Sequence, residues 1–247
     1  MFRRSAELVV GRRVRRVIDD DPIVCVDHGS MSALTGSRVN RVSRHGKLMT
    51  LWFSGGFAVD VHFGMSGRLV VDGASAIDAL VYGASDNDRW SRFRLDFAKG
   101  YLALSDPRRF GRVSWHDESA DLGPDAFGIE RSHMAELLAS RRAPVKAVLL
   151  DQSAVAGLGN MLVDEILWRS RISPHRPACD LTTAEVTRLH RETGRVLPEL
   201  MAAGGSHAGK LSAELRVPGS VCPRDGAVLA RTVCGGRTTY ACPLHQT

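Results

Sequence analysis

The alternation of apolar and polar positions divides the chain into a strand-rich first part and a helical second part. Up to about residue 117, apolar residues recur at every second position in short runs rich in β-branched and aromatic side chains. These runs predict strands at 12–18, 48–53, 57–62, 68–71, 92–97, 101–104 and 112–115. Gly55-Gly56 and Lys99-Gly100 stand between runs, where hairpin turns are expected. Short strands at this spacing predict an antiparallel β-sandwich or barrel.

From about residue 123 to 205 the apolar period becomes helical. Thr182 and Glu185 have the spacing of a capping box, and a helix is expected from there to about Met201, bent at Pro198. Apolar residues one turn apart indicate earlier helices, as at Val145, Val148 and Leu149, and at Leu162 with Ile166.

The last forty or so residues predict a hairpin of 227–233 against 238–242, with Cys234-Gly235-Gly236 at its tip. The fold class is therefore α+β. We expect a β-sandwich domain at 1–117, a helical domain at 118–205 and a small hairpin domain at 206–247.

Composition narrows the class of protein. The chain has 247 residues, 44% hydrophobic and 24% charged, as is usual for a soluble globular protein. Its net charge of +6 favours a polyanionic partner, and its many arginines suit phosphate contacts, although a codon-composition bias would give the same counts. No run approaches the roughly 20 apolar residues of a membrane span. Cys25 and Cys179 are expected to be buried thiols in a reducing cytoplasm.

Four residues of the tail have the spacing of a structural metal site. Cys222 and Asp225 form one short pair, and Cys242 and His245 form a second pair beyond the hairpin. Two such pairs closed by a hairpin are typical of a tetrahedral zinc site, which gives a small domain the stability that its core lacks. Cys234 is the alternative fourth ligand, but the hairpin places it at the far tip. A hairpin without metal remains the other interpretation.

Gly157-Leu158-Gly159-Asn160 joins two helical segments. Glycines permit close backbone approach, Asn160 can cap the following helix, and the free N–H groups at that helix start can hold a phosphate. This pattern is typical of a helix-two-turn-helix, although many glycine-rich junctions are only connectors.

Two loops between strands combine apolar and cationic side chains. In one loop, Arg108 and Phe110 follow Asp106-Pro107, and in the other Met65 lies between two glycines. An apolar residue beside a cation on a tight loop suits a wedge that enters a base stack, although the loop taken alone favours a Phe that packs inward. Lys47 is expected to open a strand within reach of a phosphate.

Together these patterns resemble a known family. The motifs, in chain order, are His62-Phe63-Gly64-Met65-Ser66-Gly67, Asp106-Pro107-Arg108-Arg109-Phe110-Gly111, Leu122-Gly123-Pro124, Gly157-Leu158-Gly159-Asn160 and Gly236-Arg237-Thr238-Thr239. In this order, and over nearly the whole chain, they resemble the formamidopyrimidine-DNA glycosylase/endonuclease VIII family. The tail departs from the four cysteines of the family's zinc finger.

The resemblance implies a base-excision repair protein that binds duplex DNA with a damaged base or an abasic site. It implies glycosylase and AP-lyase chemistry, one structural Zn²⁺, and a monomer associated with the bacterial nucleoid. By the same resemblance, Met65, Arg108 and Phe110 would fill the space that a flipped base leaves. The implied remaining DNA contacts are His62, Lys47 beside the lesion phosphate, and Lys146, Asn160 and Arg237 on flanking phosphates.

The start of the sequence departs from the family pattern. Family members begin Met-Pro-Glu, and the resemblance makes that proline the nucleophile and that Glu the proton carrier. Met1-Phe2-Arg3-Arg4-Ser5 aligns instead with the middle of the family's first helix, and the first proline is Pro22. We therefore expect neither the nucleophile nor its Glu to have a counterpart in this sequence, unless its true start lies upstream. The catalytic residue stays unassigned, and Lys47 is one possible amine. The alternative function is a catalytically inactive module that binds damaged DNA.

Overall fold

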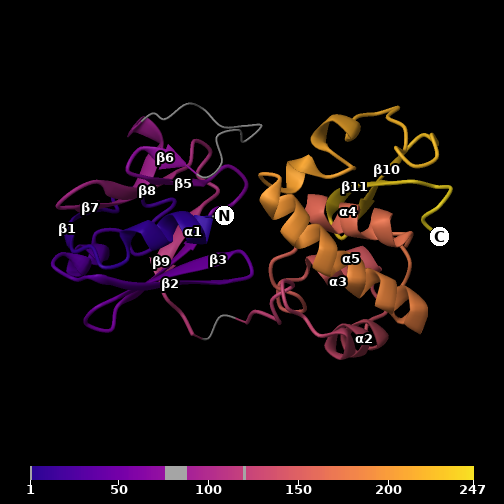
Figure 1. Cartoon of the computed structure of the whole chain (residues 1–247), viewed down its shortest axis with the longest axis horizontal. Helices are drawn as coiled ribbons and strands as arrows, with labels where there is room; N and C mark the ends of the chain where they lie inside the picture. The colour runs from indigo at the N-terminus through magenta and orange to yellow at the C-terminus, as the bar shows by residue number, and fades with distance from the viewer. Residues whose placement is uncertain (1, 76–87, 119–120) are drawn as a thin grey trace. The chain divides into compact units, whose positions relative to one another are not determined.

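The computed structural model describes residues 2–75, 88–118 and 121–247, which form two compact units, Met1–Ala120 and Asp121–Thr247 (Figure 1). The first unit contains two antiparallel sheets, as predicted. A five-stranded sheet has the order β1-β7-β8-β5-β6, and a four-stranded sheet has the order β2-β3-β4-β9. The strands are β1 Val14–Ile18, β2 Val39–His45, β3 Leu48–Phe53, β4 Ala58–His62, β5 Arg68–Val71, β6 Ala74–Ser75, β7 Ser91–Phe97, β8 Tyr101–Ser105 and β9 Arg112–Trp115.

The seven predicted strands are confirmed, and β2 and β6 are additional. β2 lies at an edge of its sheet and presents only Val39 and Val42 to the interior, so its sequence alternates weakly. One apolar core joins the two sheets. Fully buried side chains of the five-stranded sheet (Leu69, Leu95, Leu102, Leu104) and of the four-stranded sheet (Leu51, Val59, Val61, Val113) contribute to it.

A short helix, α1 Phe2–Ala6, continues into a 3-10 turn, Glu7–Val9, and buries Ala6 and Val9 in this core. A second 3-10 turn, Ser30–Leu34, buries Met31 and Leu34. Cys25 is fully buried, as expected.

Two loops pass between the sheets at the same edge of this unit. The β4–β5 loop leaves the four-stranded sheet, and the β8–β9 loop returns to it. Because His62 pairs with Arg112 across β4 and β9, and Arg68 pairs with Ser105 across β5 and β8, both loops start and end beside each other. This edge therefore brings together two segments that are forty residues apart in the sequence.

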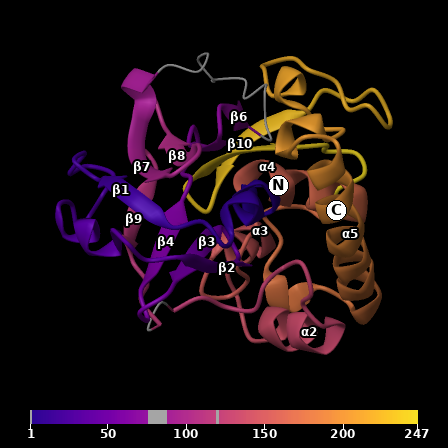
Figure 2. The same ribbon diagram turned by 60° about the vertical axis from the view of Figure 1, so that its left-hand side comes forward.

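The second unit consists of helices followed by a hairpin (Figure 2). The helices are α2 Arg131–Ala139, α3 Val145–Leu150, α4 Asn160–Ser170 and α5 Thr183–Ala202, with 3-10 turns at Ala178–Asp180, Ser206–Ala208 and Ala213–Leu215. The hairpin strands are β10 Ala230–Cys234 and β11 Arg237–Ala241, joined by Gly235-Gly236. The predicted capping box at Thr182 and Glu185 is confirmed, and α5 continues through Pro198.

Two expectations about this unit were wrong. Cys179 is exposed rather than buried, because it lies in the short 3-10 turn before α5. Asn160 does not cap α4. It is the first residue of that helix, Gly159 holds the cap position, and the Asn160 side chain reaches away to another segment. Among the residues that the structure describes, no helix combines the length and the apolar character that crossing a membrane requires.

Candidate nucleic-acid interface and metal centre

The edge of the first unit that carries the two loops also carries Lys47 and His62. Lys47 lies in the tight turn between β2 and β3 rather than in a strand, because His45 already pairs with Leu48. Leu48, the residue after Lys47, pairs with His62, so Lys47 and His62 lie at the same end of the sheet. Burial and the nearby Lys47 ammonium lower the pKa of His62. Its Nδ1 accepts a hydrogen bond from Gly64 N at 3.0 Å, which also requires an unprotonated nitrogen.

The two loops display apolar side chains to solvent. Met65 is 63% exposed and Phe110 is 49% exposed. The Arg108 guanidinium lies over the Phe110 ring, 5.0 Å from its centroid. The structure thus brings together Lys47, His62, Met65, Arg108 and Phe110 at one edge, with cations around an apolar pair. Phe110 does not pack inward.

Arg109 stands between Arg108 and Phe110 in the sequence, and its side chain anchors the loop to Asp21. It adopts a left-handed backbone conformation with φ of 56°, and its Nε donates to Asp21 at 2.8 Å. Burial would raise the pKa of Asp21, but the hydrogen bonds from Arg109 and from the Ile23 amide, with the charge of Arg92, lower it. Sequence reasoning missed Asp21, because nothing near it in the sequence indicates a partner almost ninety residues away.

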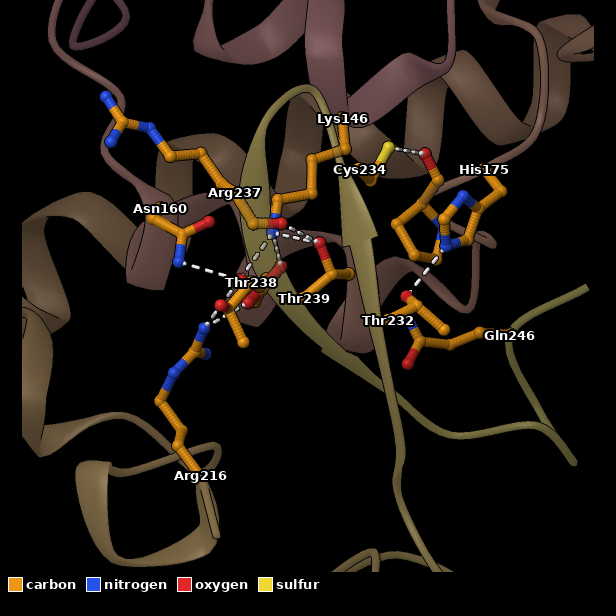
Figure 3. A network of polar contacts seen from close by, with 12 residues as sticks. Lys146, Asn160, His175, Arg216, Thr232, Cys234, Arg237, Thr238, Thr239 and Gln246 are labelled. Atoms are coloured by element: carbon orange, nitrogen blue, oxygen red, sulfur yellow. Dashed lines mark hydrogen bonds and ion pairs between the residues drawn. The ribbon is translucent and has the colours of Figure 1, made fainter. Parts of the chain in front are cut away.

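In the second unit, the start of α4 and the hairpin meet at one carbonyl group. Asn160 Nδ2 donates to the Thr238 carbonyl at 2.9 Å, and Arg216 Nη2 approaches the same oxygen at 3.4 Å (Figure 3). Arg237, the residue before Thr238, is exposed at the first position of β11. Asn160 and Arg237, which the resemblance assigned to phosphate contacts, are therefore held close together.

Lys146 lies in the same network but differs from the expectation. Its side chain is fully buried, and its Nζ donates to Asp164 at 2.6 Å and to Thr239 at 2.7 Å. Burial lowers the pKa of Lys146, and the Asp164 carboxylate opposes that shift. With no exposed surface, this ammonium cannot touch a phosphate in the conformation described. Lys146 instead joins α3 and α4 to β11 (Figure 3).

The four tail residues converge on one point. One ligand atom from each of Cys222, Asp225, Cys242 and His245 lies within 4.8 Å of the others. Cys242 Sγ lies 3.3 Å from the Asp225 carboxylate, and Cys222 Sγ lies 3.8 Å from His245 Nδ1. Ligands about 2.0–2.3 Å from a tetrahedral Zn²⁺ are separated by distances of this size. The donor types and their spacing therefore fit a structural zinc ion.

Neighbouring groups orient these ligands, as is usual around metal sites. Trp168 Nε1 donates to Cys222 Sγ at 3.3 Å, and the Cys242 amide donates to Gln246 at 2.7 Å. Around them is a small cluster of buried side chains: Trp168, Leu211, Cys222, Leu229, Tyr240 and Cys242. So small a core is consistent with a domain that depends on a metal.

Cys234, the alternative ligand, lies apart from this group. It is buried at the end of β10, paired with Arg237, and its thiol donates to the Pro174 carbonyl at 3.3 Å. Burial raises the pKa of this thiol. The geometry favours Asp225 over Cys234 as the fourth ligand.

Comparison with known proteins agrees with these features. The family model for the formamidopyrimidine-DNA glycosylase N-terminal domain matches residues 1–113, and that for the H2TH domain of the same enzyme matches residues 122–211. A formamidopyrimidine-DNA glycosylase from Roseiflexus sp. (strain RS-1) is 34% identical, covering 96% of this chain and 93% of its own. The enzyme from Acidiphilium cryptum (strain JF-5) is 32% identical, with coverages of 100% and 96%.

Solved structures give the same result. The complex of Lactococcus lactis Fpg with abasic-site DNA has a TM-score of 0.83 and 26% identity, covering 100% of this chain and 97% of that one. The complex of the same protein with FAPY-dG DNA has a TM-score of 0.82, again with 26% identity. The sequence and the structure together show that the chain belongs to the formamidopyrimidine-DNA glycosylase family.

Proposed function

We propose that this chain is a base-excision repair protein that binds duplex DNA containing a damaged base or an abasic site. The observation that carries the proposal is the exposed pair Met65 and Phe110, flanked by cations, at one edge of the first unit. Apolar side chains in this setting enter a base stack where a base is missing or has been turned out. The Lactococcus lactis relative, whose fold this chain shares, has been crystallised with such DNA.

The polar residues support the same function. Lys47 and Arg108 on the first unit, and Asn160 and Arg237 on the second, are of the types that contact phosphates. The lowered pKa of His62 favours its neutral form, and because Nδ1 accepts from Gly64 N, Nε2 can donate a hydrogen bond without adding charge. We assign Lys146 to supporting the hairpin rather than to a direct contact.

We further propose that one structural Zn²⁺ is held by Cys222, Asp225, Cys242 and His245. Bound there, the ion would fix the chain on both sides of the hairpin that carries Arg237. The ion would have no part in the chemistry, because four protein ligands leave it no open position.

The family's chemistry, glycosidic-bond cleavage followed by strand nicking, is proposed for the same site. It requires an amine that attacks C1′ of the sugar and forms an iminium. Lys47 is the candidate among the side chains at the edge of the first unit.

Borohydride trapping tests this function. The full chain is incubated with a duplex containing an abasic site, and borohydride then reduces any iminium to a permanent bond. We expect a covalent complex, together with base release from a formamidopyrimidine lesion. The Lys47→Met variant tests that amine, with Lys210→Met as the matched lysine control.

The possible outcomes separate the alternatives. Loss of trapping in Lys47→Met alone identifies Lys47 as the amine, and unchanged trapping in both variants excludes Lys47. Tight binding without trapping or base release contradicts the enzymatic proposal and supports the inactive binding module. Failure to prefer abasic over intact duplex contradicts the proposed function as a whole.

A further inference from the structure

We propose that Ser66 and Asp106 act as a clamp that holds Met65 and Phe110 together as one preformed wedge. They would be positioning residues for the recognition of a duplex that lacks a stacked base. The inference rests on the proposed function, since it concerns how the same edge recognises its DNA. Neither residue would itself touch the DNA.

The Asp106 carboxylate ties the two loops to each other. Its side chain is fully buried, and it accepts a short hydrogen bond from the Ser66 hydroxyl of the other loop. It also accepts bonds from two amides of its own loop, Gly111 N at 2.6 Å and Arg108 N at 3.3 Å. One carboxylate thus fixes the start and the end of the segment that carries Phe110, and joins it to the residue next to Met65.

The main chain of Asp106 is held as well. Its carbonyl accepts from Arg92 Nε at 2.8 Å, and its amide donates to the Trp90 carbonyl at 2.8 Å. Both main-chain groups of Asp106 therefore have protein partners. These bonds hold the residue in place directly after β8, where the loop begins. Losing one of these partners would leave a buried polar group unsatisfied, which costs stability.

The two loops also touch through their backbones. Gly64 has φ of 59°, and a Cβ on it would lie 2.3 Å from the Phe110 carbonyl oxygen. Only a residue without a side chain allows this approach. The loop with Met65 and the loop with Phe110 are therefore packed on each other, and the buried Ser66–Asp106 hydrogen bond also joins them.

A wedge whose loops are already ordered binds DNA more tightly than one that becomes ordered on contact. The entropy cost of ordering the loops is then part of folding and no longer part of binding. This gain applies only where Met65 and Phe110 enter the stack. On an intact duplex, the cations act on phosphates whether or not the loops are ordered. Weakening the clamp should therefore reduce the preference for damaged duplex and leave binding to intact duplex unchanged.

The test uses Ser66→Ala, which removes the hydroxyl, and Ser66→Thr, which keeps it. Asp106→Asn is a second variant, because its single amide oxygen can accept at only one of the two positions that the carboxylate oxygens occupy, and its NH2 group replaces an acceptor at the other. Ser32→Ala is the matched control, since Ser32 is exposed and its hydroxyl donates to the nearby Gly29 carbonyl. The probe is a duplex with a tetrahydrofuran abasic analogue opposite 2-aminopurine, whose fluorescence rises on unstacking.

We expect the wild-type chain and Ser32→Ala to prefer the abasic duplex and to raise the fluorescence. Ser66→Ala should lose about tenfold of that preference, the size of a lost hydrogen bond to a charged group, together with most of the fluorescence rise. Asp106→Asn should lose at least as much, and Ser66→Thr should restore both signals. Binding to intact duplex should not change.

Two results would overturn the clamp. One is a wild-type preference and fluorescence rise in both Ser66→Ala and Asp106→Asn. The other is an equal loss of binding to both duplexes with a lowered unfolding temperature, which would show a purely structural role. If the wild-type chain itself shows no preference, the proposed function fails first, and the clamp fails with it.

Discussion

Asn160 and Thr238, seventy-eight residues apart, are joined by a hydrogen bond of 2.9 Å from the Asn160 amide to the Thr238 carbonyl. The bond fixes the start of α4 against the start of β11, where Arg237 is exposed. A helix start and a hairpin cation held this close can contact neighbouring phosphates of one strand. We therefore propose that Asn160 and Arg237 act as one element of the interface rather than as two independent side chains.

Replacing Arg237 with Ala should weaken binding to abasic duplex by about tenfold at low salt, because one charge-assisted phosphate contact is lost. Asn160→Ala should weaken it as well, through the lost helix-start contact and the released hairpin. Fluorescence anisotropy with a labelled duplex measures both effects. Arg231→Ala, an exposed arginine of β10, is the control and should bind normally. Normal binding by the first two variants would remove both residues from the interface.

Much of the fold was predictable from the sequence, because burial on one face leaves an alternating pattern. The strands that pack on the core followed that pattern, while β2, an edge strand with few inward apolar residues, did not. The convergence of the metal ligands was also predictable, since two short pairs on either side of a hairpin must meet. The role of Lys146 was not, because its burial depends on Thr239, ninety-three residues away.

Asp164 lies between two cations, and this arrangement predicts an asymmetry in stability. Its carboxylate bonds Lys146 through Oδ1 and Arg216 through Oδ2, each at 2.6 Å. Asp164→Asn should lower the free energy of unfolding by about 3 kcal/mol, because buried Lys146 and partly buried Arg216 lose their counter-charge. Lys146→Met should cost less, since Arg216 still pairs with the carboxylate. Chemical denaturation measures both.

The control for this comparison is Glu199→Gln, which removes an exposed partner of Arg169. An exposed ion pair contributes less than about 1 kcal/mol, so this variant should unfold nearly as the wild type does. A cost for Lys146→Met that exceeds that of Asp164→Asn would contradict the proposed arrangement.

The metal centre predicts one zinc ion per chain in elemental analysis of the purified protein. Cys242→Ser should lose the ion, and Cys234→Ser should keep it, because only Cys242 belongs to the ligand group. Asp225→Cys should slow the removal of zinc by a chelator, since thiolate is the stronger ligand for this ion. Removing the metal should also change the fluorescence of Trp168, which bonds Cys222. Zinc lost in Cys234→Ser but kept in Asp225→Ala would reverse the assignment.

His62 predicts a pH dependence whose sign follows from its lowered pKa. Burial and Lys47 both disfavour the imidazolium, so its NMR titration midpoint should lie below the usual value of about 6.5. His62 then binds a proton more readily in the unfolded chain than in the folded one. Its protonation should therefore lower the free energy of unfolding as the pH falls through about 6.5, the usual pKa of histidine. Lys47→Met should raise the midpoint. A midpoint at or above the usual value would show that His62 is not in this environment.

The residues that position the two loops of the candidate interface were harder to find from the sequence than the residues that these loops expose. Met65, Arg108 and Phe110 lie in short motifs that the sequence alone singled out, although the composition of the second motif by itself favoured a Phe110 that packs inward. Ser66 and Asp106 lie in the same motifs, but their hydrogen bond depends on which strands the two loops connect. Only the pairing of β4 with β9 and of β5 with β8 brings them together.

The salt dependence of binding to an abasic duplex tests the central claim most directly. Binding led by phosphate contacts releases counterions, so the affinity should fall steeply between about 50 and 200 mM salt. The slope of log affinity against log salt should become shallower by about one in Arg237→Ala. We predict this fall together with a preference for abasic over intact duplex. An affinity that is unchanged across the salt range, or equal for the two duplexes, would contradict the account.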